Sequence, residues 1–131
     1  RYPTLILEHK ADGKTLCGTT SESCELVTAF GVFVYLKPLC TFGYFKEMIR
    51  VCKPGGHIIF DCYLSEEWSL KVLDAWLASG NLYPILLTRG LILDFFKREN
   101  CTCVKEFRGR HGADRSDYFV FRKDISENFP K

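Results

Sequence analysis

Two acidic side chains in this sequence lie where a folded chain could use them to bind a ligand. Asp12, followed by Gly13, comes soon after the short apolar stretch 5–8. A carboxylate there can accept hydrogen bonds from a ligand, but Asp-Gly is also common in plain surface turns. Asp61 interrupts the apolar stretch 57–63. Because a buried carboxylate is costly without a partner, Asp61 is equally a structural group or a ligand-binding one.

Aromatic side chains with a polar atom form the second set of candidates. Tyr35, Tyr63 and Trp68, with Tyr83 as a fourth, follow stretches that indicate strands. Such rings line apolar pockets and hold cationic groups through cation–π attraction. Since aromatic residues make up 15% of the chain, most must pack in the core, and we expect at most two of the four to line a pocket.

No set of residues typical of acid–base, nucleophilic or metal catalysis is evident. His9, His57 and His111 are far apart in the sequence, and Cys101 and Cys103 have no histidine or C-x-x-C pair nearby, whereas a structural zinc site needs four ligands. We therefore assign no catalytic residue and no metal. The seven cysteines lack the spacing of a disulfide framework, which indicates a reducing compartment such as the cytoplasm.

Alternating strands and helices must position these side chains. Besides 5–8, the hydrophobic pattern predicts strands at 25–30, 57–63, 101–108 and 116–123, and helices at 41–52, 65–80 and 88–99. Thr41 and Ser65 are the expected N-caps of the first two helices, and Gly80 the expected end of the second. The polar stretch 109–115 is expected to be a loop between the last two strands.

The first predicted helix has an apolar stripe on one side. Its polar side is expected to leave Lys46, Glu47 and Arg50 in water. The helix is followed by Lys53-Pro54-Gly55-Gly56, in which proline cannot continue a helix and glycine can adopt positive φ. A helix that feeds an apolar strand through such a turn is typical of an α/β sheet.

Three of these segments carry a family resemblance. Glu25-Leu26-Val27 opening a strand, the turn 53–56, and the closing strand Tyr118-Phe119-Val120-Phe121-Arg122-Lys123 occur in this order. The chain resembles, over nearly its whole length, class I S-adenosylmethionine-dependent methyltransferases of the small-molecule type. The resemblance implies a partial Rossmann-like methyltransferase sheet of the α/β class, mostly parallel with an antiparallel last strand, and with helices on both faces. The three segments correspond to the family's fourth, fifth and last strands.

The resemblance also implies roles for particular residues. Asp12 would accept a hydrogen bond from the adenine amino group of S-adenosylmethionine, with the backbone of Gly13 alongside. Ala29, Phe30 and Gly31 would lie near the methionine part of this cofactor. Tyr35, Tyr63 and Trp68 would meet a small-molecule acceptor. Methyl transfer from a sulfonium can proceed by positioning alone, so the lack of a catalytic residue is compatible with it.

The sequence departs from the family at its beginning. The glycine-rich loop and the acidic residue that hold the cofactor in this family do not occur before Asp12. We therefore expect a single incomplete domain over residues 1–131, with a frayed tail at about 124–131, that is inactive alone. A missing N-terminal segment or a swapped copy of the chain would then complete the sheet beside the strand 25–30.

Composition narrows the function classes. The net charge of +2 with mixed signs gives no indication of nucleic acid or membrane binding. Two functions remain. The chain is part of a methyltransferase that acts on a small molecule, or it is a non-catalytic methyltransferase-like remnant that binds a protein.

Overall fold

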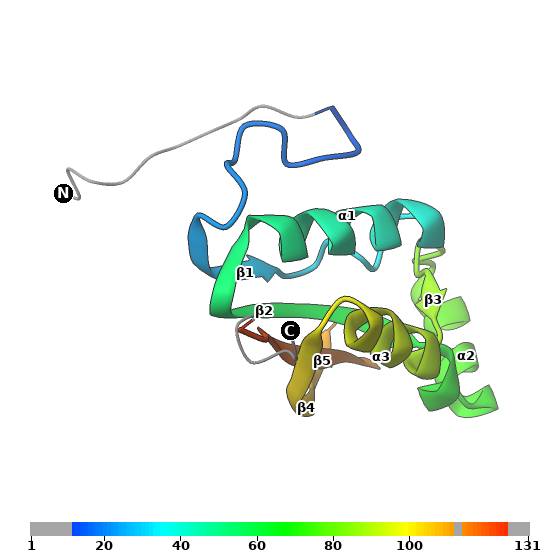
Figure 1. Cartoon of the computed structure of the whole chain (residues 1–131). Helices are drawn as coiled ribbons and strands as arrows, with labels where there is room; N and C mark the ends of the chain where they lie inside the picture. The colour runs from blue at the N-terminus through cyan, green and yellow to red at the C-terminus, as the bar shows by residue number, and fades with distance from the viewer. Residues whose placement is uncertain (1–11, 112–113, 126–131) are drawn as a thin grey trace, which may run out of the picture.

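The computed structural model describes residues 12–111 and 114–125 (Figure 1). In chain order the elements are β1 (Cys24–Ala29), α1 (Pro38–Val51), β2 (Cys52–Leu64), the 3-10 turn η1 (Ser65–Glu67), α2 (Leu70–Ser79), β3 (Leu86–Leu87), α3 (Arg89–Arg98), β4 (Cys101–His111) and β5 (Asp114–Lys123). The predicted strand 5–8 and the end of the predicted tail lie outside the described residues.

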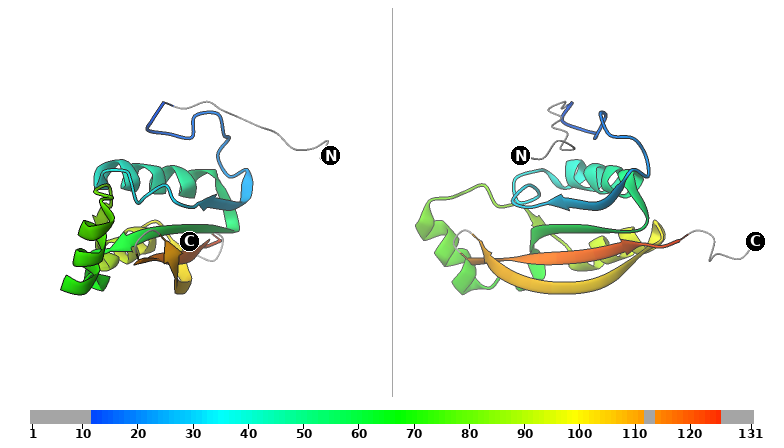
Figure 2. Two further views of the ribbon diagram at one scale, coloured as in Figure 1. Left: turned by 180° about the vertical axis from the view of Figure 1, so that it is seen from behind. Right: turned by 90° about the vertical axis from the view of Figure 1, so that its left-hand side faces the viewer.

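The strands form a mixed sheet in the order β1-β2-β5-β4 (Figure 2). β1 is parallel to β2, while β5 is antiparallel to both β2 and β4. This agrees with the predicted α/β class and with the predicted antiparallel last strand, and β5 lies between β2 and β4. The short strand β3, which the sequence did not predict, pairs in parallel with the end of β2.

Helices α1 and α3 pack on one face of the sheet and form the main core with it. Along β2, Ile58, Phe60 and Cys62 alternate onto this face and are completely buried. The ring of Phe60 lies 4.6 Å from that of Phe45 in α1 and 5.7 Å from that of Phe96 in α3, measured between centroids. The apolar stripe predicted for the first helix is therefore confirmed as core.

Helix α2 packs beyond the carboxyl end of β2 on a second, smaller cluster. Tyr63 alternates to the face opposite Phe60, and its ring centroid lies 5.3 Å from that of Trp76 in α2. Val34 from the loop after β1 completes this cluster. Helices thus lie on both faces, as predicted, although α2 covers only the carboxyl end of the sheet.

The first helix begins earlier than predicted and uses a different cap. It starts at Pro38, with Lys37 at the N-cap position, because proline fits the first helical turn, whose N–H has no partner within the helix. The prediction that Thr41 caps this helix was wrong. Thr41 is buried inside the helix, where its hydroxyl donates to the carbonyl of Leu36 over 3.5 Å.

The second helix begins later than predicted. Ser69, not Ser65, is its N-cap, and its side chain accepts a hydrogen bond from the N–H of Val72. Gly80 ends the helix at a φ of 75°, as expected for a left-handed glycine cap. The acidic residues after Ser65 belong to the separate turn η1.

The described residues of the polar stretch 109–115, which are 109–111 and 114–115, lie in β4 and β5 and not in a loop. Gly109 pairs with Ser116, Arg110 with Arg115 and His111 with Asp114. The antiparallel ladder therefore continues through all the described residues of this stretch. Polar composition misled the prediction, since an antiparallel hairpin can keep polar side chains in water while its backbone stays paired.

The predicted turn 53–56 is a bulge at the start of β2. Cys52 pairs with Cys24 and His57 with Leu26, so the turn stands opposite Glu25 alone. Gly55 has a φ of 85°, which confirms the expected positive value. At Gly56 an added Cβ would lie 2.8 Å from the carbonyl oxygen of Glu25, so close backbone approach excludes larger residues.

Part of the sheet is uncovered by the described residues. Among the described residues, β1 has a strand neighbour on one side only, β2, and Leu26 on β1 is 57% exposed.

None of the helices in ranges 12–111 and 114–125 is long and apolar enough to cross a membrane.

Candidate functional site

A cavity of about 400 Å³ lies beside β1, on the face of the sheet that α1 covers. Gly13 and Leu16 from the segment before β1 line one side of it, and Ala29 lies at the end of the strand. Its other lining residues are Val27, Thr28, Val32, Phe33, Leu36, Tyr44 and Met48. The cavity is mostly apolar and lies near the carboxyl end of a parallel strand, where α/β sheets bind ligands. It brings together two of the expected cofactor residues, Gly13 and Ala29.

Asp12 forms a tight turn next to this cavity. Its Oδ1 accepts hydrogen bonds from the N–H of Lys14 at 2.8 Å and of Thr15 at 2.6 Å, and Oδ2 accepts from the Thr15 hydroxyl at 2.6 Å. The side-chain hydrogen bond from Thr15, followed by the backbone ones, lowers the pKa of Asp12 to about 2. A carboxylate has about four lone-pair sites. The ionised, exposed side chain therefore keeps acceptor capacity for a ligand.

The carboxyl end of β1 is held by Asp61. Its Oδ1 accepts a hydrogen bond from the N–H of Gly31 at 2.8 Å, and the side chain is only 1% exposed. Gly31 itself has a φ of 69°, a left-handed conformation that favours glycine. Asp61 therefore fixes the sharp bend in which the chain leaves β1, and the structural reading of Asp61 has direct support.

Phe30 points away from the cavity beside β1. Its side chain is 55% exposed, and its ring centroid lies 6.0 Å from that of Tyr118 on β5. Tyr118 stacks in turn on Phe107 of β4. The residues expected near the methionine part of the cofactor thus surround the end of β1 and do not share one cavity.

The three aromatic candidates for the acceptor are close together but differ in exposure. Tyr63 is completely buried, whereas Tyr35 is 56% exposed and its ring lies tilted beside that of Tyr83, with 4.7 Å between centroids. Trp68 is half-buried and lies parallel to Trp76 at 6.0 Å. Burial, and then the hydrogen bond with Tyr83, raises the pKa of Tyr63 well above its usual range. Tyr35 and Trp68 are accessible to a ligand, whereas Tyr63 is buried with its ring centroid 6.5 Å from that of Trp68.

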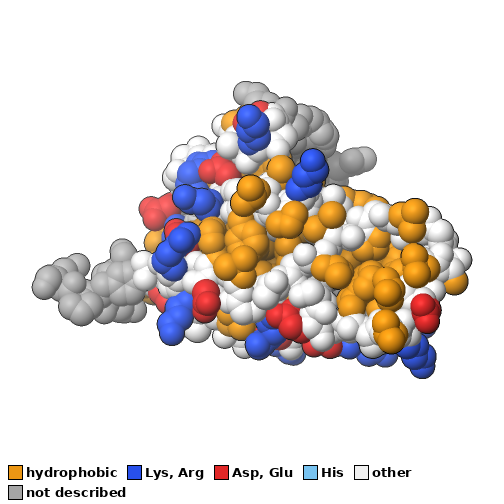
Figure 3. All heavy atoms as spheres, turned by 90° about the vertical axis from the view of Figure 1, so that its right-hand side faces the viewer, with side chains coloured by type: hydrophobic (Ala, Val, Ile, Leu, Met, Phe, Trp, Pro, Cys, Tyr) orange, Lys and Arg blue, Asp and Glu red, His pale blue; other side chains and the backbone are white. Residues whose placement is uncertain are grey.

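An exposed apolar patch covers α2 (Figure 3). Its exposed leucines are Leu70, Leu73, Leu77 and Leu82. Between them and the two tryptophans lies a shallow hollow of about 160 Å³. The patch continues the aromatic cluster outward, so apolar surface extends from Trp68 across the outside of α2.

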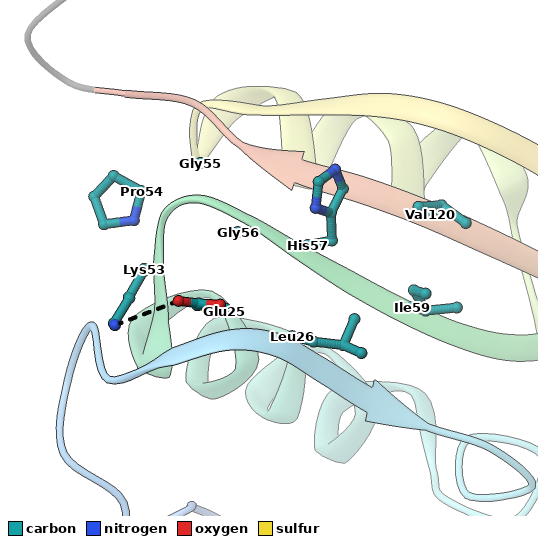
Figure 4. Close-up of a pocket in the computed structure, with 9 residues that line it drawn as sticks. All are labelled: Glu25, Leu26, Lys53, Pro54, Gly55, Gly56, His57, Ile59 and Val120. Atoms are coloured by element: carbon teal, nitrogen blue, oxygen red, sulfur yellow. Dashed lines mark ion pairs between the residues drawn. The ribbon is translucent and has the colours of Figure 1, made fainter.

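A wider groove of about 760 Å³ crosses the uncovered face of the sheet (Figure 4). Leu26, Ile59 and Val120 form its apolar floor, and the turn 53–56 forms one end. Figure 4 shows these side chains on the near face with α1 and α3 behind the sheet. The groove lies at the amino ends of β1 and β2, so it is separate from the cavity beside β1.

The buried cysteines of the described part of the chain pack as apolar groups. All seven are free, and no group of three or more His, Cys, Asp or Glu side chains within ranges 12–111 and 114–125 is arranged to hold a metal ion. Burial raises the pKa of Cys101 to about 12 and that of Cys62 further. These thiols stay protonated and pack as small apolar groups.

Solved structures of methyltransferases share this fold. An S-adenosylmethionine-dependent methyltransferase from Methanosarcina mazei superposes with a TM-score of 0.68 at 11% identity, over 88% of this chain and 66% of that one. A magnesium protoporphyrin IX methyltransferase from Synechocystis, with bound S-adenosylhomocysteine, gives 0.67 at 9% identity, over 87% and 49%. An N-methyltransferase from Bradyrhizobium japonicum gives 0.54 at 14%, over 82% and 55%.

At these identities the likeness shows the fold alone. This chain spans between 49% and 66% of the length of these three structures. No family model matches the sequence, and no curated protein matches it either.

Sequence reasoning missed most walls of the cavity beside β1. Leu16, Tyr44 and Met48 line it, yet a helical apolar stripe does not distinguish cavity residues from core residues. Glu47 and Arg50, expected in water, are partly buried with side-chain exposures of 17% and 33%. Both contact the segment before β1, which carries no secondary-structure pattern that would have revealed the contact.

Proposed function

We propose that this chain is part of an S-adenosylmethionine-dependent methyltransferase that acts on a small-molecule acceptor. The observation that carries the proposal is the sheet order β1-β2-β5-β4 with antiparallel β5, together with an apolar cavity at β1. The solved methyltransferases with this fold support it. Since the chain spans only part of their length, the activity belongs to the complete protein.

The described residues fit the cofactor in part. An apolar cavity lined by Gly13 and Ala29 suits a flat, mostly apolar ring, and Asp12 beside it supplies an ionised acceptor for an amino group. Phe30 and Gly31 would lie along the methionine part. When bound, S-adenosylmethionine supplies a methyl group activated by a sulfonium.

The chain's own residues would bind the cofactor and the acceptor and orient them toward each other. Asp61 holds the backbone of Gly31 and thereby keeps the end of β1 in one conformation. Tyr35 and Trp68, with Tyr63 beside Trp68, would present aromatic faces to the acceptor and exclude water from it. The described residues would contribute orientation of acceptor and donor, and any proton that the acceptor loses on methylation would pass to water.

In this proposal the remaining partner binds at two places on the chain. These are the groove over Leu26, Ile59 and Val120 and the free edge of β1. A further segment of the complete protein, or a swapped copy of the chain, would pack there and add the missing cofactor contacts. A soluble protein located in the cytoplasm is consistent with seven free thiols.

The same uncovered face is the observation that favours the second function. A methyltransferase-like remnant that binds a protein would use this groove and would need no cofactor. The two functions differ in one measurement, which is calorimetric binding of S-adenosylhomocysteine to the complete protein. Micromolar binding, followed by transfer of labelled methyl groups to a panel of small molecules, supports the enzyme. Absence of binding, with the protein folded, contradicts it and favours the remnant.

A further inference from the structure

Arg50 near the end of α1 ties the segment before β1 to that helix. Its Nε donates to Oε2 of Glu47 at 2.9 Å. Nη1 donates to the carbonyl of Thr19 at 3.1 Å and to the hydroxyl of Ser21 at 2.9 Å. Nη2 donates to the carbonyl of Leu16 at 3.1 Å and to Oε1 of Glu47 at 2.9 Å. Every N–H of the guanidinium group therefore has an acceptor.

Glu47 completes the attachment from the other side. Its Oε1 accepts a hydrogen bond from the N–H of Leu16 at 2.9 Å. Glu47 and Arg50 thus hold both backbone polar groups of Leu16, through charge-assisted hydrogen bonds that are stronger than neutral ones. We call this pair of side chains the Glu47–Arg50 clamp.

The clamp and the cavity beside β1 share one residue. Leu16 and Gly13 line the cavity on one side, and Tyr44 and Met48 line it from α1, the helix that carries the clamp. The segment from Asp12 to the start of β1 contains no helix or strand. Two backbone hydrogen bonds hold the end of this segment to the end of α1, from the N–H of Glu22 to the carbonyl of Arg50 at 2.8 Å and from the N–H of Ser23 to the carbonyl of Val51 at 2.9 Å. Leu16 itself is held to α1 by the clamp.

We propose that Glu47 and Arg50 are positioning residues, which fix Leu16 as a wall of the cavity. They thereby raise the affinity of the cavity for the S-adenosyl group. This inference rests on the proposed function, since it concerns the same cavity. It adds a residue pair that is not among the lining residues of the cavity and that acts through the segment before β1, above all through the backbone of Leu16.

Variants of the complete protein at Arg50, Leu16, Glu47 and Lys46 test the proposal. Arg50→Lys keeps the charge but cannot supply the planar set of donors. Leu16→Ala removes the wall itself. Lys46→Met, on the exposed side of the same helix, is the matched control. For each, hydrogen exchange of the amide at residue 16 reports the clamp, calorimetry with S-adenosylhomocysteine reports the cavity, and the melting temperature reports global folding.

We expect Arg50→Lys to speed exchange at residue 16 and to raise the dissociation constant about tenfold, the effect of losing one or two charged hydrogen bonds. Leu16→Ala should raise the dissociation constant by a similar factor. The double variant Arg50→Lys/Leu16→Ala should raise it no further, because both changes act through the same wall of the cavity. Glu47→Gln, which keeps an oxygen for the Leu16 amide, should have a smaller effect. Lys46→Met should change nothing.

Two results would overturn the proposal, and they are distinguishable. If the unaltered protein binds S-adenosylhomocysteine and Arg50→Lys speeds exchange without weakening binding, the clamp is only a structural attachment and the proposed function stands. If the unaltered protein binds no S-adenosylhomocysteine at all, the proposed function fails and this inference fails with it.

Discussion

At the scale of single residues, local hydrogen bonds decide what a carboxylate can do. Asp12 and Asp61 are both candidate ligand groups by sequence, yet their surroundings differ. Asp12 is exposed and bonded within its own turn, while Asp61 is buried and bonded to Gly31. An exposed carboxylate can exchange its partners for a ligand at little cost, whereas a buried one cannot.

The carboxyl group of Asp12 should titrate below its ordinary pKa. Its folded-state pKa is about 2, below the ordinary value of about 3.9. Because the folded pKa is lowered, the turn's contribution to stability is complete above the ordinary pKa and is lost as pH falls through the folded one. NMR of the Asp12 carboxyl carbon should therefore give a midpoint near pH 2, and Thr15→Val should raise it. A midpoint at the ordinary value in the folded protein would show that the turn does not form.

The same residue carries a prediction about affinity. In the complete protein, Asp12→Ala should weaken cofactor binding by about 1.5–3 kcal/mol, the range for a hydrogen bond to a charged group. Thr15→Val is the matched control, since it removes one bond of the turn and keeps the carboxylate. Calorimetry of both variants separates the roles. Equal losses in the two would assign Asp12 to the turn, and no loss in either would remove it from the site.

Asp61 should matter for stability instead. Asp61→Ala leaves the N–H of Gly31 without its acceptor in a buried setting, at a cost of about 1–3 kcal/mol in the free energy of unfolding. Asp61→Asn keeps a carbonyl oxygen there and should cost less. Asp74→Asn, on the exposed side of α2, should cost almost nothing. Urea unfolding measures all three, and an Asp61→Ala variant as stable as Asp74→Asn would contradict the role given to Asp61.

At the scale of elements, glycines lie where the backbone needs a positive φ. Gly55 in the bulge of β2 and Gly80 at the end of α2 both adopt positive φ, and a turn and a helix end were predicted at these positions because few other residues take that conformation. Gly56 is required for a different reason, which is the close approach of the Glu25 carbonyl. Such a contact joins residues far apart in sequence and could not be predicted from the turn itself.

The turn 53–56 should therefore act as scaffold. Gly55→Val should lower the free energy of unfolding by more than ~1 kcal/mol because a β-branched residue is strained at positive φ. Gly56→Ala should also destabilise, through steric contact. Gly43→Ala in α1, where an added Cβ meets nothing within 4 Å, should stabilise by about 0.5–1 kcal/mol. In the complete protein the folded fraction of each should keep its cofactor affinity. Lost affinity at unchanged stability would place the turn in the site.

Sequence reasoning predicted the elements that depend on local patterns and missed those that depend on contacts between distant parts of the chain. Strands β1, β2, β4 and β5 and helix α3 follow from hydrophobic periodicity, which is local and strong. The strand β3 has only Leu86–Leu87, too short for any period, and exists because β2 pairs with it. The Glu47–Arg50 clamp was taken for solvent-facing charge, because a helical pattern shows which side is polar but not what covers that side.

At the scale of the whole molecule, burial is one-sided. Helices α1 and α3 bury one face of the sheet, and α2 covers only the carboxyl end of the other. Among the described residues, the groove over Leu26, Ile59 and Val120 is open and no strand pairs with the outer edge of β1. An unpaired edge strand and an exposed apolar sheet face are typical of an interface within a larger assembly. The cavity beside β1 lies along this same edge, so its completion and the covering of the edge are coupled.

The final prediction follows from this coupling. The 131-residue chain alone should bind S-adenosylmethionine only weakly, because the glycine-rich loop and the acidic residue that the family resemblance implies for holding this cofactor do not occur before Asp12. The complete protein should bind it in the micromolar range or tighter. Calorimetry compares the two proteins at equal concentration, and circular dichroism establishes that both are folded. Asp12→Ala in the complete protein measures how much one contact contributes to the affinity. Micromolar binding by the 131 residues alone would show that this part of the sheet forms a sufficient cofactor site, and that the uncovered edge serves another purpose.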